Sequence, residues 1–278
     1  MGVLTDVKEV LGARELLLNL TRRELRGKYK GTALGWGWSL VNPLASTLIF
    51  TAVFSVVLRV QPPIGVDGLN NYALFLLCGL LTWNFFSGAL SSGMGVLTGN
   101  GNLIKKTYFP RRLLVVSNIM ALFVTYLIEM LVLAVIFLVF RVNVLPWIPL
   151  VLVVMLLTAV LALGFSLILS VVNVYFRDVA HFVAIALQIW FYATPIIYPI
   201  TMVEATRDSA GWAGRFHIAD IYLANPMVGL IEAIRDMWYS GTMPDFRLLG
   251  YVAALSIVLL WFGNYVFGRL EVRLGEEL

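Results

Sequence analysis

The sequence has 278 residues, of which 60% are hydrophobic and only 13% are charged, and its formal net charge is +4. Soluble chains carry about 25% charged residues, so this composition excludes a soluble globular domain and places the whole chain in a membrane. Its one cysteine, Cys78, lies inside an apolar run, which excludes a disulfide framework and a thiolate metal cluster. We therefore expect an all-α membrane protein.

The first segment, residues 1–33, is basic and amphipathic. Leu11, Leu18 and Leu25 recur every seven residues, and basic residues take other positions. Those basic residues include Arg14, Arg22, Arg23, Arg26 and Lys28. The pattern predicts a helix along the membrane surface, with its basic face toward lipid phosphates. A solvated helix without a particular role is the alternative.

Six long apolar segments follow within residues 34–267, and residues 268–278 form a tail. Each segment has about the 20 residues that are needed to cross a hydrocarbon core of ~30 Å. The expected spans are 34–58, 72–96, 113–140, 147–172, 181–200 and 248–267. The Asn42-Pro43 pair predicts a kink in the first span, because proline removes a backbone donor.

Six crossings place both termini on one side of the membrane. Most of the 20 Lys and Arg residues then lie on that same side. Lys and Arg are enriched in cytoplasmic loops, so we expect both termini to be cytoplasmic.

Two of the connections on that side have further features. Residues 99–112 begin with turn formers, continue as a short basic helix and end at Phe109-Pro110. In the other connection, the charged pair Arg177-Asp178 precedes the fifth apolar run, which Pro195 and Pro199 close. Proline breaks or kinks a helix, and a membrane tolerates a break only where protein or a cavity satisfies the freed carbonyls. We interpret the fifth span as a helix that is pushed at Arg177-Asp178 and shapes a pathway at its far end. The alternative is an ordinary span with an interfacial turn.

The predicted external loop, residues 201–247, is far longer than usual helix connections. Within it, Asn225-Pro226 precedes an apolar periodic stretch, and proline is favoured at a first helical position. Glu232, Arg235 and Asp236 mark the expected polar side of this helix. We expect it to dip into the outer leaflet, with a purely extracellular helix as the alternative.

Several catalytic patterns are absent from the sequence. No G-x-x-x-x-G-K-[ST] motif exists, so the chain cannot hydrolyse ATP by that route. His181 and His217 are isolated, and neither H-E-x-x-H nor G-x-S-x-G occurs. We expect no catalytic residue, no metal site and no nucleic-acid partner.

Glu129 is the one carboxylate in the middle of a predicted span. An ionisable group there indicates a functional site by default, because lipid exposure of its charge is costly. It either faces a cavity or is a structural residue that is hydrogen-bonded to another helix. Aromatic rings can stack on the apolar faces of sugars, although several aromatic residues also suit interfacial belts. The candidates for lining a channel are Trp38, Phe50, Phe54, Trp83, Phe86, Trp190, Phe191 and Tyr198.

Five motifs in order resemble a known family from about residue 14 to residue 267. They are Leu34-Gly35-Trp36 through Asn42-Pro43-Leu44, LIKKTYFPRRLL at 103–114, Phe176-Arg177-Asp178-Val179, ATPIIYP at 193–199, and Asn225-Pro226-Met227. The chain resembles the membrane subunit of ABC-2-type exporters of polysaccharides and polyol phosphates. Within that family it is most similar to teichoic-acid translocation permeases, and the O-antigen permeases share these motifs.

The resemblance implies a homodimer of six-helix subunits in the bacterial cytoplasmic membrane, with two copies of a separate ATP-binding subunit. The partner would bind ATP and Mg²⁺, and this chain would bind no cofactor. The substrate would be a lipid-linked polysaccharide of the undecaprenyl pyrophosphate type, with wall teichoic acid preferred.

By position, residues 14–28 resemble the family's interface helix, with Arg22, Arg23, Arg26 and Lys28. The ATPase-coupling positions are Asn102, Leu103, Ile104, Lys105, Lys106, Arg177 and Asp178. Residues 201–239 resemble re-entrant external helices, and the first and fifth spans would line the channel.

Other functions remain open at this point. An O-antigen or other polysaccharide exporter is the nearest alternative, followed by an ABC-2 exporter of drugs or small lipids. A lipid-linked glycan transferase should show paired acids at the membrane surface, which the sequence lacks. A stand-alone ion or proton carrier would work without an ATPase.

Overall fold

The computed structural model describes residues 12–28, 31, 35–57, 59–60, 62–107, 109–205 and 218–271. Within these ranges all regular secondary structure is helical, as expected. Five helices are long and apolar enough to cross a membrane. They are α3 (Trp38–Phe50) continued by the π-helix η2 (Thr51–Val57), α4 (Tyr72–Gly99), α6 (Arg112–Val139), α7 (Ile148–Tyr175) preceded by η4 (Leu145–Trp147), and α13 (Phe246–Leu270). They coincide with five of the predicted spans, with shifts of a few residues at the ends.

The fifth predicted span differs from the structure. Helix α8 (Val179–Tyr192) has only 14 residues, and the chain then turns until Pro199. The expected helix over 181–200 is therefore too long. Pro195 and Pro199 have no N–H to donate, and each disfavours a helical residue before it, so the helix ends short of both.

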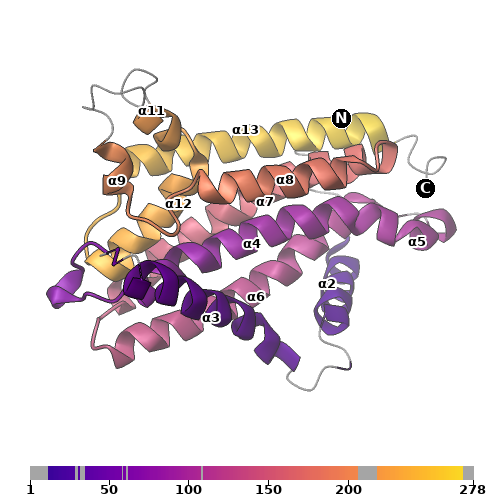
Figure 1. Cartoon of the computed structure of the whole chain (residues 1–278). Coiled ribbons are helices and arrows are strands. Elements are labelled where there is room, and N and C mark those ends of the chain that lie inside the picture. The colour runs from indigo at the N-terminus through magenta and orange to yellow at the C-terminus, as the bar shows by residue number, and fades with distance from the viewer. Residues whose placement is uncertain are drawn as a thin grey trace.

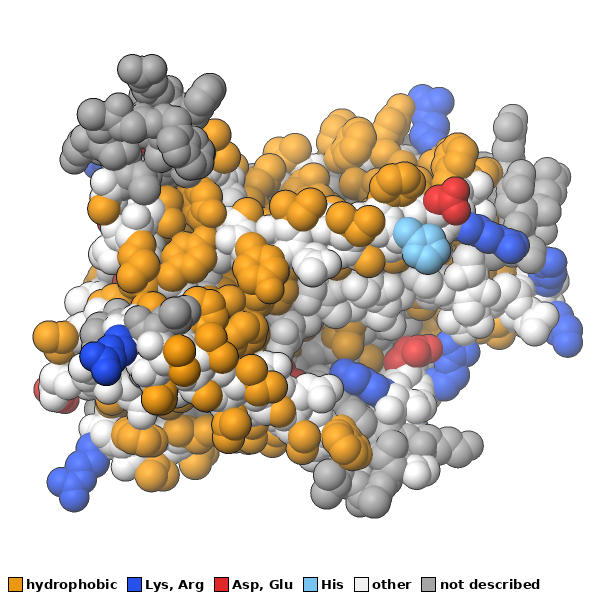
Figure 2. Space-filling model, viewed as in Figure 1, with side chains coloured by type: hydrophobic (Ala, Val, Ile, Leu, Met, Phe, Trp, Pro, Cys, Tyr) orange, Lys and Arg blue, Asp and Glu red, His pale blue; other side chains and the backbone are white. Residues whose placement is uncertain are grey.

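Helix α3 continues through Pro43 without ending. Its next residues, from Thr51, form a π-helix, a geometry often found at functional sites. Many apolar side chains of α3 and of this π-helix are exposed, including Leu48 of α3 and Val56 of the π-helix, which are 72% and 71% exposed. Figure 2 shows such apolar side chains across this face of the molecule. These surfaces suit lipid or a neighbouring chain rather than water.

Helix α4 forms the centre of the bundle (Figure 1) and packs against α6 and α7. Every residue from Leu74 to Trp83 is buried. Nearly all of these side chains are apolar, so the run can be enclosed on all faces by other helices. This buried helix carries Asn84 and Tyr72 to the two sides of the bundle core.

Two glycines allow α7 and α13 to approach closely. A Cβ atom on Gly263 would collide with the carbonyl oxygen of Gly164, and one on Gly164 would lie 2.8 Å from the carbonyl carbon of Leu259. Small residues let helix backbones come together in membranes, where packing drives association. Backbone contact therefore fixes the position of α13 on the bundle.

One end of the bundle, which we call the α5 end, holds two short helices. Helix α2 (Arg14–Lys28) runs across the long axis of the bundle, and α5 (Gly101–Lys106) lies at its tip (Figure 1). Leu20, Ile104 and Leu113 belong to one buried apolar cluster there. The structure thus contains helices at the positions of the predicted amphipathic segment and of the predicted short basic helix, both held by apolar anchors.

The opposite end, which we call the α12 end, contains the long connection between α8 and α13. Its described helices are α9 (Ile200–Glu204), α11 (Ile218–Leu223), α12 (Pro226–Arg235) and the π-helix η5 (Asp236–Ser240), and residues 206–217 of the predicted re-entrant region lie outside the described residues. Helix α12 begins at Pro226 as predicted, with the Asn225 side chain accepting from the Met227 N–H. The expected polar side is wrong for Arg235, which is only 2% exposed.

Candidate functional site

At the α5 end, helix α5 presents most of its polar side chains outward. Asn102, Lys105 and Lys106 are exposed, Leu103 is half-buried, and Ile104 is buried in the apolar cluster. The helix is thus anchored by one apolar side chain and offers an amide and two ammonium groups to a partner. Phe109-Pro110 separates it from α6, as the sequence indicated.

A hydrogen bond joins α2 to the corner between α4 and α5. The guanidinium of Arg23 donates to the side-chain oxygen of Asn100 over 2.7 Å, and Asn100 donates to the carbonyl of Val96 over 2.8 Å. Arg23 also pairs with Glu24 at 2.7 Å. Of the other predicted interface residues, Arg22, Arg26 and Lys28 are exposed. The Arg23–Asn100 contact links α2 to the residue that immediately precedes α5.

The Arg177-Asp178 turn lies at the same end of the bundle, between α7 and α8 (Figure 1). Both residues are exposed, and the carbonyl of Asp178 accepts from the N–H groups of His181 and Phe182. A carboxylate before a helix N-terminus interacts favourably with the helix dipole. Tyr175 holds this turn to α13, because its hydroxyl donates to the carbonyl of Leu270 over 3.0 Å.

At the α12 end, buried donors bind the carbonyl groups that follow the end of α8. Arg235 donates to the carbonyls of Pro195 and Ile196 over 2.5 and 2.6 Å. The hydroxyl of Tyr72 donates to the carbonyl of Ile197 over 2.6 Å. These contacts satisfy backbone acceptors that a helix would otherwise have satisfied, which is the condition for a break at membrane depth.

Asn225 holds the other side of the same turn. Its side-chain oxygen accepts from the indole of Trp190 over 2.9 Å, and its amide donates to the hydroxyl of Thr194 over 2.9 Å and to the carbonyl of Ala193 over 3.3 Å. The sequence identified Asn225 only as a helix start. Its second function, which is to fix the end of α8 to the start of α12, depends on a contact across 35 residues.

Arg235 has an acidic neighbour on its own helix. Its guanidinium contacts the Glu232 carboxylate at 2.7 Å. Burial raises the pKa of Glu232, and Arg235 opposes that rise. Burial, followed by the Glu232 charge, raises the pKa of Asp236 to about 6.

The predicted channel aromatics fall into two groups. Trp83 and Phe86 are 4% and 0% exposed, so they pack inside the protomer. Their rings contact the α8 rings at centroid distances of 5.8 Å for Trp83–Phe191 and 5.2 Å for Phe86–Trp190. The remaining candidates, Trp38, Phe50, Phe54, Trp190, Phe191 and Tyr198, are half-buried or exposed. Lining of a channel stays a prediction for all eight residues.

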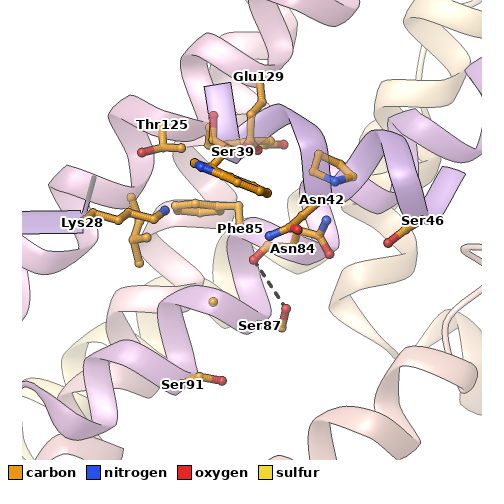
Figure 3. Close-up of a pocket in the computed structure, with 15 residues that line it drawn as sticks. Lys28, Ser39, Asn42, Ser46, Asn84, Phe85, Ser87, Ser91, Thr125 and Glu129 are labelled. Atoms are coloured by element: carbon orange, nitrogen blue, oxygen red, sulfur yellow. Dashed lines mark hydrogen bonds between the residues drawn. The ribbon is translucent and has the colours of Figure 1, made fainter. Parts of the chain in front are cut away.

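A pocket of about 620 Å³ opens between α3, α4 and α6. Figure 3 shows Asn84, Phe85, Thr125 and Glu129 around it, with Lys28 approaching from the end of α2. Its other lining residues are Trp38, Ser39, Asn42, Pro43, Ser46, Ser87, Gly88, Ser91, Leu122 and Tyr126. Glu129 therefore faces a cavity, which is the first of the two alternatives left open by the sequence.

The serine and asparagine side chains of the pocket were not identified from the sequence. Ser39, Asn42 and Ser46 follow one another at helical spacing on α3, and Asn84, Ser87 and Ser91 do so on α4. Residues three and four apart share one helix face, so this spacing was the available signal. Only the tertiary packing shows that the two faces meet Glu129.

Comparisons with known proteins agree with the motif resemblance. A family model described as ABC-2 type transporter matches residues 15–239. The chain is 31% identical over 273 residues to an O-antigen export system permease protein RfbA of Myxococcus xanthus, covering 98% of each chain. It is 30% identical over 265 residues to a protein of the same name from Klebsiella pneumoniae, covering 95% of each. A polysialic acid transport protein KpsM of Escherichia coli is 24% identical over 259 residues, which is 90% of this chain and 91% of KpsM.

Proposed function

Because the chain belongs to the ABC-2 type transporter family, we propose that it is the permease of an ATP-driven exporter of lipid-linked polysaccharide in the bacterial cytoplasmic membrane. The observation that carries this proposal is the near full-length similarity to two O-antigen export permeases. The five long apolar helices agree with a multi-pass membrane protein. The chain itself is a permease and not an enzyme.

The relatives favour an O-antigen type of polymer over wall teichoic acid, the preference drawn from the motifs. Both RfbA proteins are named for O-antigen export, and the KpsM protein is named for polysialic acid transport. Teichoic acid stays a prediction without support from these relatives. A neutral or acidic polysaccharide on an undecaprenyl pyrophosphate-type lipid is the substrate class that we propose.

The exposed residues at the α5 end support the proposal that a separate ATP-binding subunit docks there. Helix α5 and the Arg177-Asp178 turn are exposed there, on connections that reach α4, α6, α7 and α8. Movement of a partner at this end would therefore reach four long elements at once. In this proposal the α5 end is cytoplasmic, two ATP-binding subunits bind ATP and Mg²⁺, and α2 lies on the lipid surface.

The exposed apolar faces of α3 and α8 support a second copy of the chain. Phe182, Ile185 and Ile189 of α8 are 71%, 58% and 65% exposed and share one face of the helix. We place the two-fold seam along α3 and α8, with the polymer path between protomers. The helix break after Tyr192 would shape the outer end of that path, and α9 to α12 would be the re-entrant helices.

The test uses the permease co-expressed with the ATP-binding subunit from the same organism and reconstituted in lipid nanodiscs. Lipid-linked polysaccharide should stimulate ATP hydrolysis, and Arg177→Ala or Asp178→Ala should abolish most of that stimulation with normal membrane insertion. Arg247→Ala, an exposed cation at the α12 end, is the control and should keep it. Stimulation by hydrophobic drugs in place of the polysaccharide would contradict the proposal and favour a drug exporter.

A further inference from the structure

The pocket between α3, α4 and α6 is polar at a place where the surrounding chain is apolar. It is lined on α3 by Ser39, Asn42 and Ser46, on α4 by Asn84, Ser87 and Ser91, and on α6 by Thr125 and Glu129. Polar groups at membrane depth are costly and normally pair with one another or face a water-filled cavity. These face a common cavity of about 620 Å³, a size typical of small-molecule sites.

Two hydroxyl groups of this pocket donate within their own helices. Ser87 donates to the carbonyl of Trp83 over 2.9 Å, and Thr125 donates to the carbonyl of Ala121 over 3.2 Å, each within its own helix. A hydroxyl that donates in this way keeps acceptor lone pairs for a further partner. The hydroxyl of Tyr126, another lining residue, is bonded to the Thr82 hydroxyl at 2.9 Å and joins α6 to α4.

The remaining groups indicate a ligand that both donates and accepts hydrogen bonds. The amides of Asn42 and Asn84 each offer two donors and one acceptor oxygen, and the Glu129 carboxylate only accepts. Sugar hydroxyls meet this set, because each one is both a donor and an acceptor. Figure 3 shows Asn42, Asn84 and Glu129 directed toward the same space from three helices.

Aromatic rings flank these polar groups. Trp38 is 43% exposed, and Phe85 is stacked on Tyr126 at a centroid distance of 4.7 Å and an interplanar angle of 8°. Phe85 is thereby held in one orientation at the pocket wall. An aromatic ring beside amides and a carboxylate gives a flat apolar surface for the C–H face of a sugar ring.

The charges of the pocket argue against a phosphate ligand. A pocket with one acidic and one basic lining residue has no surplus of positive charge with which to attract a phosphate. The one cation among the described lining residues is Lys28, whose charge balances that of Glu129. A neutral ligand adds no charge to this balanced pair, so it suits the site better than a pyrophosphate or a phospholipid headgroup.

We propose that this pocket binds an uncharged sugar ring and is a recognition site for the polymer, separate from any site for its pyrophosphate. The inference rests on the proposed export function. Asn84 and Glu129 bind ring hydroxyls, Asn42 contacts them from the opposite wall, and Trp38 and Phe85 cover the ring.

The test is saturation-transfer difference NMR on the full chain, assembled with its ATP-binding partner in nanodiscs without nucleotide. The probes are the methyl glycosides of glucose, rhamnose and N-acetylglucosamine, with inorganic pyrophosphate as competitor. Transfer to at least one glycoside is expected, and pyrophosphate should not displace it. Loss of the signal on addition of pyrophosphate, or absence of transfer to all three sugars, would overturn the proposal.

Matched variants locate the bound sugar. Asn84→Leu, Glu129→Gln and Thr125→Val should each weaken glycoside binding, by about 3- to 10-fold for each hydrogen bond lost. Thr158→Val is the control for Thr125→Val, because its hydroxyl also donates to its own helix but lies outside the pocket. Asn84 is exposed, so its replacement leaves the core intact. Equal binding in Asn84→Leu, Glu129→Gln and the control would place the sugar elsewhere.

The same preparation separates this proposal from the proposed function. ATP-dependent export of polysaccharide without glycoside binding in the pocket would reject the sugar site and leave the export function standing. Glycoside binding in a complex that hydrolyses ATP but exports no polysaccharide would reject the export function instead. A glycolipid that competes with the glycosides but is not exported would identify the bound sugar as a lipid headgroup rather than the polymer.

Discussion

The guanidinium carbon of Arg235 lies 3.7 Å from the centroid of the Phe75 ring. In this position the cation is stacked on the ring, and its N–H groups reach the Phe75 carbonyl, the two carbonyls after α8 and the Glu232 carboxylate. A buried cation is stable only when its donors are satisfied. One side chain thus joins α12, the central helix α4 and the end of α8.

Removal of Arg235 should destabilise the protein strongly. Arg235→Ala removes a donor from three backbone carbonyls and a carboxylate, which costs about 3–5 kcal/mol. Arg235→Lys keeps the positive charge but loses the planar guanidinium with its several N–H donors. The stability of this variant should therefore lie between those of the alanine variant and the wild type. Thermal unfolding in nanodiscs measures the stabilities of the three proteins. Arg247→Ala removes an exposed arginine and should change little; equal stability of the two alanine variants would contradict the assigned contacts.

The Gly164–Gly263 contact should not accept a methyl group. Gly263→Ala drives a Cβ into the Gly164 carbonyl, and overpacking of this kind costs about 1–3 kcal/mol. Gly250→Ala is a control on the same helix, since nothing lies within 4 Å of its added Cβ. Thermal unfolding of the two variants under the same conditions measures the difference in their stability. A Gly263→Ala variant that is as stable as Gly250→Ala would disprove close packing of α7 on α13.

The Arg23–Asn100 bond should contribute to coupling more than to stability. It is exposed, so its loss should cost no more than about 1 kcal/mol. A double-mutant cycle with Arg23→Ala and Asn100→Ala measures polysaccharide-stimulated ATP turnover in the assembled complex. The two single variants should each lower it, and the double variant should lower it no further. Fully additive losses would show that the two residues act separately, and Arg14→Ala on the same helix is the control.

Asp236 should make stability depend on pH. Its pKa in the folded chain is raised to about 6 from an ordinary 3.8, so the folded protein holds this proton more tightly than the unfolded chain does. The stabilisation is therefore full below pH ~4 and is lost as the pH rises through about 6. Asp236→Asn should unfold at a higher temperature than the wild type at pH 7 and should flatten this decline. An unchanged slope between pH 4 and 7 would contradict the raised pKa.

The sequence predicted the long spans well, because an uninterrupted apolar run of sufficient length has few alternatives to a crossing helix. The fifth span was predicted too long. Pro195 and Pro199 were recognised as breakers, yet the end of the helix at Tyr192 depends on Asn225, which binds Thr194 and Trp190 from a distant part of the chain. The helix propensities of the residues around Tyr192 cannot reveal a contact with such a distant residue.

The burial of Arg235 could not be predicted for the same reason. On a single helix, arginine beside Glu232 and Asp236 indicates a polar face. Its acceptors come from Phe75 and Pro195, which are 160 and 40 residues away. Likewise, the burial of Trp83 and Phe86 follows from the central position of α4, which the residue types alone do not indicate.

The central claim is that this chain moves polysaccharide only when a separate ATPase drives it. The direct measurement uses proteoliposomes that contain the permease, its ATP-binding subunit and a labelled lipid-linked polysaccharide, with ATP added outside. We predict that the polymer loses access to an external glycosidase at a rate that requires both ATP and the partner. Equal protection of the polymer with the permease alone, or without ATP, would contradict the account.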